Sequence, residues 1–421
     1  MSLDATERGI CAGIEATADN LLKQLGEYVS IPTGGNYTPG LEQLRSLLIE
    51  RLSTLGAGIE LLPGASAPPW LTPRTWRGEG GDAAAPPPPP PPPTVVARHP
   101  ADGASPRVLI VGHLDTVHDP DGPFDTLSLS EDGRRATGPG AVDMKGGLLI
   151  ALGALEALAE AGVELAWTMV LNSDEETGSF GSADALRAVA RVHDLGIVME
   201  PALADGGLAL QRMGSGQFMI EFFGRSAHVG RNFADGRSAV VELARTIISL
   251  DGLARPQSGT IVNTGPLTGG TVTNTVPDHA ACWGNARFVD AKTAADLAAA
   301  IDGLATAADQ LPRVVVRRQW NRPAKLITDG VRRFAEVVRQ AADELGQPMP
   351  FASTGGVCDG NILADEGLPT LDTLGARGGN LHRDDEYVEV SSLVQRTQLL
   401  AIVLFRIATR RLELGRAGGA R

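Results

Sequence analysis

The 421-residue sequence has little basic charge and few cysteines. It carries 37 Lys and Arg against 50 Asp and Glu, a formal net charge of -13. A nucleic-acid-binding surface needs a basic face, so this balance argues against nucleic acid as the main partner, and solubility alone explains the acidity. The three cysteines, Cys11, Cys282 and Cys358, are far apart and odd in number. We therefore expect no disulfide framework and a reducing compartment.

Signals for export and for membrane insertion are also missing. The segment MSLDATERGICAGIEATADNLLKQL has no basic region followed by an apolar core, and no stretch reaches the roughly 18 apolar residues of a membrane span. Unless an export signal has been removed, we expect a cytoplasmic protein without a membrane partner. The 43% of hydrophobic residues is ample for two domains or for one elaborate domain.

The first hundred residues combine helical patterns with a proline-rich segment. Apolar residues at helical spacing predict helices over 16–29 and 41–55, separated by IPTGGNYTPG. From 63 to 94 the composition changes to Ala, Gly and Pro and ends in eight consecutive prolines, Pro86 to Pro93. Such a run forms a polyproline II rod of roughly 25 Å. We interpret it as a surface spacer or insertion; a binding tract for a proline-reading partner is the alternative.

The next part alternates strand and helix. Short apolar runs predict buried strands, and amphipathic stretches between them predict helices. This alternation indicates an α/β fold with a mostly parallel sheet flanked by helices. The predicted strands are 108–111, 168–171 and 196–199, and the predicted helices are 147–159 and 182–192.

The rhythm changes near residue 213 and returns near 322. The order between these points is β-α-β-β-α-β, that of a ferredoxin-like α+β unit. We therefore expect a catalytic domain in two segments, 1–212 and 322–421, with a separate domain inserted over 213–321. Within the insertion the strands are 217–223, 260–267, 280–289 and 314–319, and the helices are 238–250 and 294–307. After it come a helix over 331–345, a strand over 369–374 and a helix over 391–411, with Ser391 as its N-cap.

Acids and a histidine follow the predicted strands. His113 and Asp115 end the first, Asp174-Glu175-Glu176 follow the second and Glu200 follows the third. The carboxyl ends of strands in an open α/β sheet form the ligand-binding edge. Burying unpaired charges there costs several kcal/mol, so a divalent metal is a good reason for them. In H-x-D one residue can coordinate and the other can orient the imidazole.

The acidic cluster and the glycine-rich loops each have a second interpretation. The three consecutive acids Asp174, Glu175 and Glu176 repel one another unless a cation lies among them or the loop is solvated. Because neighbouring side chains on a non-helical backbone diverge, one of the two glutamates can bind metal while the other faces water. Asp143, in GAVDMKGG, is a ligand or a helix cap. Glu200 is a ligand or a helix-entry acid. His382, in a glycine-flanked loop, can reach the same edge. The remaining histidines, predicted in surface or packing roles, are His99, His118, His193 and His279.

Taken together, HLDTV, GPGAVDMKGG, DEETGS, VMEPA, GRSAHVG and NLHRDDEYV resemble the M20 family of zinc peptidases and deacylases, and within it the glutamate carboxypeptidase G2 type. The resemblance covers nearly the whole chain. It implies a zinc-peptidase-like fold with two Zn²⁺ per subunit, for which Co²⁺ or Mn²⁺ can substitute. By this analogy His113 and Glu200 hold one zinc, His382 and Glu176 hold the other, and Asp143 bridges them.

The resemblance also implies a mechanism and a homodimer. The zinc pair lowers the pKa of a shared water, and Glu175 acts as general base while Asp115 orients His113. His228, from the inserted lid and dimerisation domain of a second subunit, stabilises the oxyanion. The residues implied in holding the carboxylate of a small peptide or N-acyl amino acid are Arg287, Asn274 and Arg322, with a surface salt bridge as the alternative for each. Gly355 and Gly356 fit a family loop that lets the substrate approach the backbone closely.

These implications lead to one prediction and two alternatives. We expect a metallo-carboxypeptidase that removes a C-terminal, glutamate-like amino acid from an N-acyl or short peptide substrate. The first alternative is an N-acyl-amino-acid deacylase of the acetylornithine or succinyl-diaminopimelate type. The second is a catalytically inactive, metal-binding dimeric scaffold. Two features depart from the family pattern: the proline tract, and Cys358, where relatives often carry a hydroxyl residue.

Overall fold

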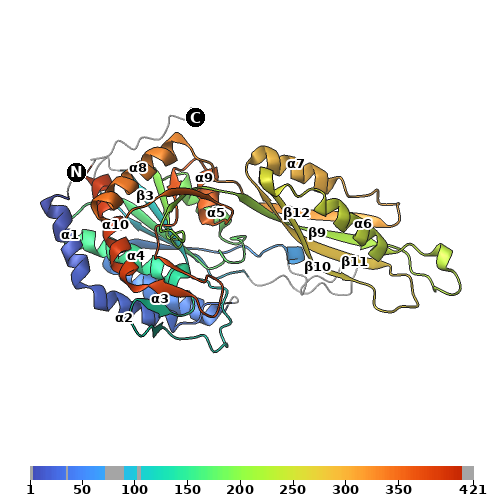
Figure 1. Ribbon diagram of the computed structural model, residues 1–421, viewed down its shortest axis with the longest axis horizontal. Helices are drawn as coiled ribbons and strands as arrows, with labels where there is room; N and C mark the ends of the chain where they lie inside the picture. The colour runs from blue at the N-terminus through green and yellow to red at the C-terminus, as the bar shows by residue number, and fades with distance from the viewer. Residues whose placement is uncertain (1–2, 35–36, 72–89, 102–105, 410–421) are drawn as a thin grey trace.

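The computed structural model describes residues 3–34, 37–71, 90–101 and 106–409, which form two lobes (Figure 1). The larger lobe contains the first and last parts of the chain, and the smaller lobe is one continuous segment between them. Each lobe has its own main apolar core, one with members from Ile10 to Ile407 and one with members from Phe218 to Val314. The predicted fold class, α/β with an inserted α+β unit, is confirmed.

The central sheet of the larger lobe has the order β1-β2-β6-β3-β7-β14. Strands β6, β3, β7 and β14 are parallel, and β1 and β2 join one edge antiparallel. Every residue of β3, β6 and β7 is buried, as expected for strands covered on both faces. The bounds are β1 (Gly58–Leu62), β2 (Thr94–His99), β3 (Val108–His113), β6 (Trp167–Asn172), β7 (Leu195–Val198) and β14 (Thr370–Leu371).

Helices flank this sheet. The Ala- and Leu-rich α4 packs against β3, and α1, α2 and α10 pack against α4. Helix α10 is long and apolar enough to cross a membrane by length and composition, which the sequence analysis missed, but 78% of its apolar window is buried in the lobe. The bounds are α1 (Ala5–Ala16), α2 (Ala18–Val29), α3 (Thr38–Thr54), α4 (Gly146–Glu160), α5 (Ala183–Ala190), α8 (Asp329–Glu344), α9 (Asp359–Asp365) and α10 (Val390–Ala408).

The smaller lobe is an antiparallel sheet of order β10-β11-β9-β12 with two helices on one face. Alternate residues of β9, including Phe218 and Phe222, pack beneath the helices, while Met219 faces the other way. The element order is β-α-β-β-α-β, as the sequence predicts. The bounds are β9 (Gly214–Phe223), α6 (Ala239–Asp251), β10 (Thr260–Gly269), β11 (His279–Phe288), α7 (Ala291–Asp302) and β12 (Arg313–Arg322).

The start of the proline-rich insertion connects the two lobes. After β1 the chain runs to a short 3-10 helix, η1 (Pro69–Leu71), where Trp70 packs on the helix-free face of the small sheet. The Trp283 indole Nε1 donates a hydrogen bond to the Trp70 carbonyl at 2.6 Å. We call residues 63–71 the strap. Pro86–Pro89, the first half of the predicted polyproline rod, lie outside the described residues.

Several elements differ from the sequence predictions. Helix α1, strands β1 and β2, and the parallel pair of β8 (Leu208–Arg212) with β13 (Phe351–Thr354) were not predicted. The Ser391 cap was wrong: α10 begins one residue earlier, with Glu389 at its N-cap. Residues 410 and 411 of that predicted helix lie outside the described residues. Short strands β4 (Ser128–Leu129), β5 (Arg135–Thr137), β15 (Gly378–Gly379) and β16 (Tyr387–Glu389) form a further small sheet.

Candidate metal centre and active site

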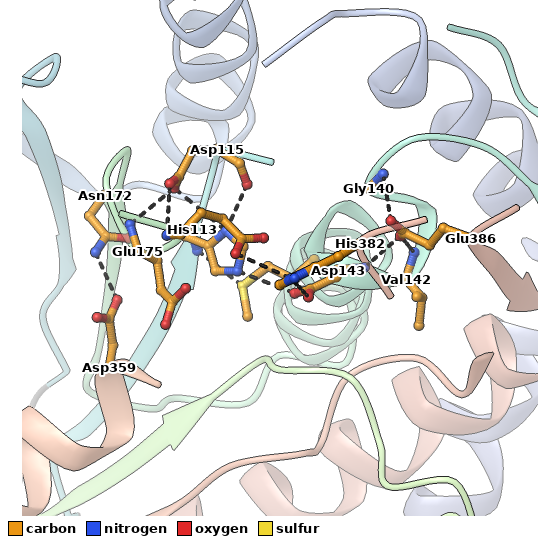
Figure 2. A network of polar contacts seen from close by, with 12 residues as sticks. His113, Asp115, Gly140, Val142, Asp143, Asn172, Glu175, Asp359, His382 and Glu386 are labelled. Atoms are coloured by element: carbon orange, nitrogen blue, oxygen red, sulfur yellow. Dashed lines mark hydrogen bonds and ion pairs between the residues drawn. The ribbon is translucent and has the colours of Figure 1, made fainter. Parts of the chain in front are cut away.

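The predicted ligands converge at the carboxyl edge of the central sheet. His113 is the last residue of β3, Glu175–Glu176 follow β6 and Glu200 follows β7. Asp143 lies in the turn η2 (Ala141–Lys145) ahead of α4, and His382 lies in the loop between β15 and β16. Figure 2 shows Asp143 beside both imidazoles. Side chains separated by up to 269 positions in the sequence (382 − 113) therefore meet at one place.

Asp143 lies between two histidines. Its Oδ1 is 3.4 Å from His113 Nε2 and its Oδ2 is 3.5 Å from His382 Nε2. The His382 Nε2 is also 3.3 Å from Glu176 Oε2. Among the described residues, two groups have ligand atoms within 4.8 Å of one another: His113, Glu175 and Glu200, and His113, Asp143 and Glu176.

The donor set fits divalent metal ions. Three buried atoms at this site, His113 Nε2, Asp143 Oδ1 and Glu200 Oε1, make no hydrogen bond within the described part of the chain. A buried polar atom without a partner costs about 1–3 kcal/mol. Imidazole nitrogens and carboxylate oxygens are ligands of catalytic zinc, so bound cations would satisfy all three atoms.

The site is electrostatically crowded. Burial raises the pKa of Glu200 well above its ordinary value, and the charges of Glu175 and Asp143 raise it further. Burial opposes ionisation of Asp143 as well, but the adjacent imidazoles of His113 and His382 hold its pKa below the usual range. Hydrogen bonds to Asp143 and Glu176 raise the pKa of His382 to about 10. Several close carboxylates therefore favour positive charge at their centre.

The role predicted for Asp115 needs a correction. The His113 Nδ1 is 2.9 Å from the backbone carbonyl of Asp115 but 3.6 Å from its carboxylate, so the carbonyl is the oxygen that orients the imidazole. The carboxylate instead accepts the backbone N–H groups of Glu175 at 3.2 Å and Glu176 at 2.9 Å. Burial, followed by weaker effects of the neighbouring acids, raises its pKa to about 8, although His113 opposes the shift. Asp115 therefore shapes the Glu175–Glu176 loop.

Glu175 and Arg322 form a buried pair beside the metal ligands. The Arg322 Nη2 is 2.6 Å from Glu175 Oε1 and donates hydrogen bonds to the Glu175 carbonyl and to Ser179 Oγ, each at 2.8 Å. Burial raises the pKa of Glu175, while Arg322 opposes the shift. Arg322, predicted to hold a substrate carboxylate, is thus paired with the predicted base in this structure.

Arg287 is placed differently. It lies opposite Ser215 of β9, and Arg322 lies opposite the same residue from the other side, so the two arginines occupy one row and one face of the small sheet. The Arg287 Nη1 is buried and makes no hydrogen bond to the described residues. Burial and then the charge of Arg322 lower its pKa. The Arg287 guanidinium, which lies near the predicted metal ligands and lacks a hydrogen-bond acceptor for Nη1 among the described residues, is suited to bind an anionic group of a substrate.

Three predicted residues do not join this cluster. His228 and Asn274 lie in paired segments at the far end of the small lobe, where the Val229 N–H donates to the Asn274 carbonyl at 3.1 Å. Arg287 pairs near the first residue of β9, whereas His228 follows its last residue. Ten residues of strand separate the two ends by roughly 30 Å. Gly356 lies nearer, in a loop beside Arg212.

The residues that support the ligands were not identified from the sequence. Glu386 accepts backbone N–H groups of the Asp143 turn (Figure 2). His118, expected only in a surface or packing role, is buried, and its Nε2 is 2.8 Å from Glu386 Oε2. Asp359 accepts a hydrogen bond from Asn172 Nδ2 at 2.7 Å beneath the Glu175 loop. Glu386 lies in NLHRDDEYV, but nothing in the sequence pairs it with residues 140–143.

Comparisons with known proteins agree with this site. Residues 109–406 match the model of peptidase family M20/M25/M40. The chain is 30% identical over 305 residues to carboxypeptidase G2 of Pseudomonas sp. (strain RS-16), covering 70% of this chain and 72% of that protein. It is 26% identical over 329 residues to succinyl-diaminopimelate desuccinylase of Nitrosospira multiformis, covering 73% and 85%.

Solved structures share the fold. A tripeptidase from Staphylococcus aureus superposes with a TM-score of 0.72 at 21% identity, covering 93% of this chain and 99% of the other. An M20 family metallo-carboxypeptidase from Sulfolobus solfataricus gives 0.71 at 15% identity, covering 92% and 99%. At these identities the likeness supports the fold alone.

Proposed function

Because the chain belongs to peptidase family M20/M25/M40, and is therefore a metal-dependent peptidase or amidohydrolase, we propose that it is a di-zinc carboxypeptidase. Its substrate is an N-acyl or short peptide with a C-terminal, glutamate-like amino acid, which it releases. The observation that carries this proposal is the cluster in which the buried Asp143 carboxylate faces two imidazoles, with Glu175 and Arg287 alongside.

Two ions are supported by the way the ligands divide. His113 and Glu200 would hold one zinc, His382 and Glu176 would hold the other, and the two oxygens of Asp143 would be shared between them. The separation of the Asp143 oxygens, one toward each imidazole, supports a bridging role. Co²⁺ or Mn²⁺ would serve as substitutes because they accept the same nitrogen and oxygen ligands.

The residues around the ligands supply the proton transfers. Zinc held by these ligands would supply Lewis-acid chemistry, polarising the scissile carbonyl and acidifying water. Glu175 removes the proton of the attacking water and then delivers it to the departing amine nitrogen. Its raised pKa, caused first by burial, suits a group that must hold the proton between the two steps. The ion pair between Arg322 Nη2 and Glu175 Oε1 fixes the Glu175 side chain.

Recognition of a free carboxylate is assigned to the arginine row. The unpaired Arg287 guanidinium can bind a carboxylate through two parallel hydrogen bonds. The Arg322 Nε, which makes no hydrogen bond to the described residues, can add a second contact. The similarity to a carboxypeptidase over 70% of the chain supports this substrate class.

A deacylase acting on small N-acyl amino acids is the second candidate. Several succinyl-diaminopimelate desuccinylases are similar to this chain at 25–30% identity. Both reactions use the same metal chemistry and differ in the group on either side of the amide. A panel of folate-like, dipeptide and small N-acyl substrates separates them. Hydrolysis of small acyl donors alone would contradict the carboxypeptidase assignment.

We also propose a homodimer formed through the small lobe. Strand β10 is at the edge of its sheet and presents unpaired backbone groups along one side. Large apolar side chains are exposed on β10 and on α6; Leu267 is 56% exposed and Ile248 is 74% exposed. His228 and Asn274 lie in the same region. A second copy bound here would bring them to the other subunit's metal centre.

The mechanism is tested with Glu175→Gln. Loss of the base should reduce turnover by at least about 10²-fold while zinc content stays at the wild-type level. Glu164→Gln, an exposed glutamate on the same lobe, is the matched control and should keep wild-type turnover. Undiminished activity of Glu175→Gln would refute the mechanism. A wild-type protein that binds metal but hydrolyses nothing would favour the inactive-scaffold alternative.

A further inference from the structure

Four N–H groups converge on the carboxylate of Glu386, which is only 1% exposed. Its Oε1 accepts the backbone N–H of Val142 at 2.9 Å and of Asp143 at 3.0 Å. Its Oε2 accepts the Gly140 N–H at 3.3 Å (Figure 2). The same oxygen lies 2.8 Å from His118 Nε2. A carboxylate has about four acceptor positions, so all of them are used. Glu386 therefore has no lone pair to spare for a metal ion.

These bonds fix the turn that carries Asp143. Gly140 adopts φ 68°, a left-handed conformation that turns its N–H toward Glu386. Successive N–H groups pointing inward make an anion-binding concavity, and here the anion is a side chain of the same protein. The Glu386 carbonyl adds a bond from the Gly138 N–H at 3.0 Å, and Tyr387 of β16 pairs with Thr137 of β5.

Glu386 also ends the loop that carries His382. Its N–H donates to the Arg383 carbonyl at 3.0 Å. Within the same loop Asn380 Nδ2 donates to Asp385 Oδ2 at 2.9 Å, and His382 itself has φ 64°. A histidine in the left-handed region is strained and persists only where its surroundings hold it. One side chain thus joins two loops, each of which presents a metal ligand.

We propose that Glu386 is a positioning residue of the metal centre. By holding the Asp143 turn against the His382 loop, it keeps one carboxylate between two imidazoles. It contacts neither substrate nor metal and acts through the residues it holds. The inference rests on the proposed metal centre. Partners of this kind are worth about 10–100-fold in metal affinity.

The test is Glu386→Gln, measured by zinc affinity in competition with a chelator. The amide keeps one acceptor oxygen and turns two N–H donors toward existing donors, so at least two of the four bonds are lost. We expect zinc affinity to fall about 10–100-fold and the visible spectrum of the Co²⁺-loaded protein to change. Glu389→Gln is the matched control: this residue lies three positions later and pairs with Arg377 at 2.9 Å on the surface. It should keep wild-type affinity and spectrum.

Wild-type zinc affinity with an unchanged Co²⁺ spectrum in Glu386→Gln would overturn the inference. If that variant does not fold, Glu386→Asp keeps the charge but withdraws the carboxylate by roughly 1.5 Å. It should bind zinc more weakly than wild type, and equal binding would again overturn the inference. A wild type that binds no divalent metal overturns both proposals. A wild type that binds metal but hydrolyses none of the substrates overturns the proposed function alone, because the Glu386 readout is metal affinity.

Discussion

Protons and metal ions compete for His382. Hydrogen bonds to Asp143 and Glu176 raise the pKa of this imidazole to about 10, so it is protonated throughout the neutral range in apoenzyme. A metal ion that binds Nε2 must displace that proton. The apparent metal affinity should therefore rise about tenfold for each pH unit between 7 and 9 from this residue alone. Isothermal titration calorimetry in buffers of different ionisation enthalpy counts the protons released.

Glu200 adds a second proton to the same balance, since burial raises its pKa well above the ordinary value. On binding the metal ion, the His382→Gln variant should release about one proton fewer than wild type, because the glutamine side chain does not titrate. Metal affinity that does not change between pH 7 and pH 9 would contradict the prediction. It would mean that His382 is already neutral in apoenzyme or does not bind the ion.

At the residue scale, side chains at strand ends are the most predictable part of the site. His113, Glu175 and Glu200 could be identified because parallel strands end at a common edge. The Asp115 carbonyl, the Arg322 pair and Glu386 could not, because they depend on how distant loops pack together. The sequence NLHRDDEYV shows only that three acidic residues follow His382 and Arg383. Which of them is buried, and against which backbone groups, is decided by the fold.

The first turns of α8 and α10 show how much a single capping hydroxyl contributes to the stability of a helix. Thr328 Oγ1 accepts the Val331 N–H at 3.2 Å at the start of α8, whereas Ser391 lies inside the first turn of α10 and is exposed. Thr328→Ala should lower the free energy of unfolding by about 1 kcal/mol, and Ser391→Ala by less than about 0.5 kcal/mol. Urea denaturation of both variants measures the difference. Equal losses would contradict this assignment of the caps.

The strap, residues 63–71, packs on the helix-free face of the small sheet and stabilises it. Trp70 packs beside Met219, Ala281 and Trp283, which are at most 5% exposed. Trp70→Ala should cost about 1–3 kcal/mol of local stability and speed amide exchange in β9 and β11. Hydrogen-exchange mass spectrometry resolves these strands. Trp70→Phe keeps an aromatic ring and should show a smaller change; unaltered exchange in Trp70→Ala would show that the strap does not hold the lobe.

Elements with a strong apolar pattern were predictable, and elements defined by their neighbours were not. Buried runs such as 108–111 indicated β3 directly. In α1 the buried apolar residues are only Ile10 and Ile14, too few to show a helical stripe. Strand β2 begins immediately after the proline tract, which hides its start. Strand β14 is only two residues long because the chain turns away after Leu371, so the prediction over 369–374 was too long.

At the scale of the whole molecule, the site is divided between regions far apart. Strand β9 starts beside Arg287 and ends roughly 30 Å away, and His228 follows that far end. An oxyanion donor at this position cannot reach the metal ligands of its own chain without a very large movement. A second subunit is the simpler source, since the proposed two-fold dimer would bring each small lobe to the partner's larger lobe.

Mixing two inactive variants tests this arrangement. Glu175→Gln subunits lack the proposed base but keep His228, and His228→Ala subunits lack the proposed oxyanion donor but keep Glu175. In a mixed dimer the site of the His228→Ala subunit has its own Glu175 and receives His228 from the partner. Random exchange makes about half of the dimers mixed, each with one complete site, so activity should recover to about a quarter of the wild-type value. Each variant alone should stay inactive after the same exchange treatment.

Recovery requires His228 to act across the interface, because action within one chain would leave every subunit in the mixture with one missing group. Absence of recovery, with exchange verified by native mass spectrometry, would place the oxyanion donor within the subunit and remove the need for the dimer in catalysis.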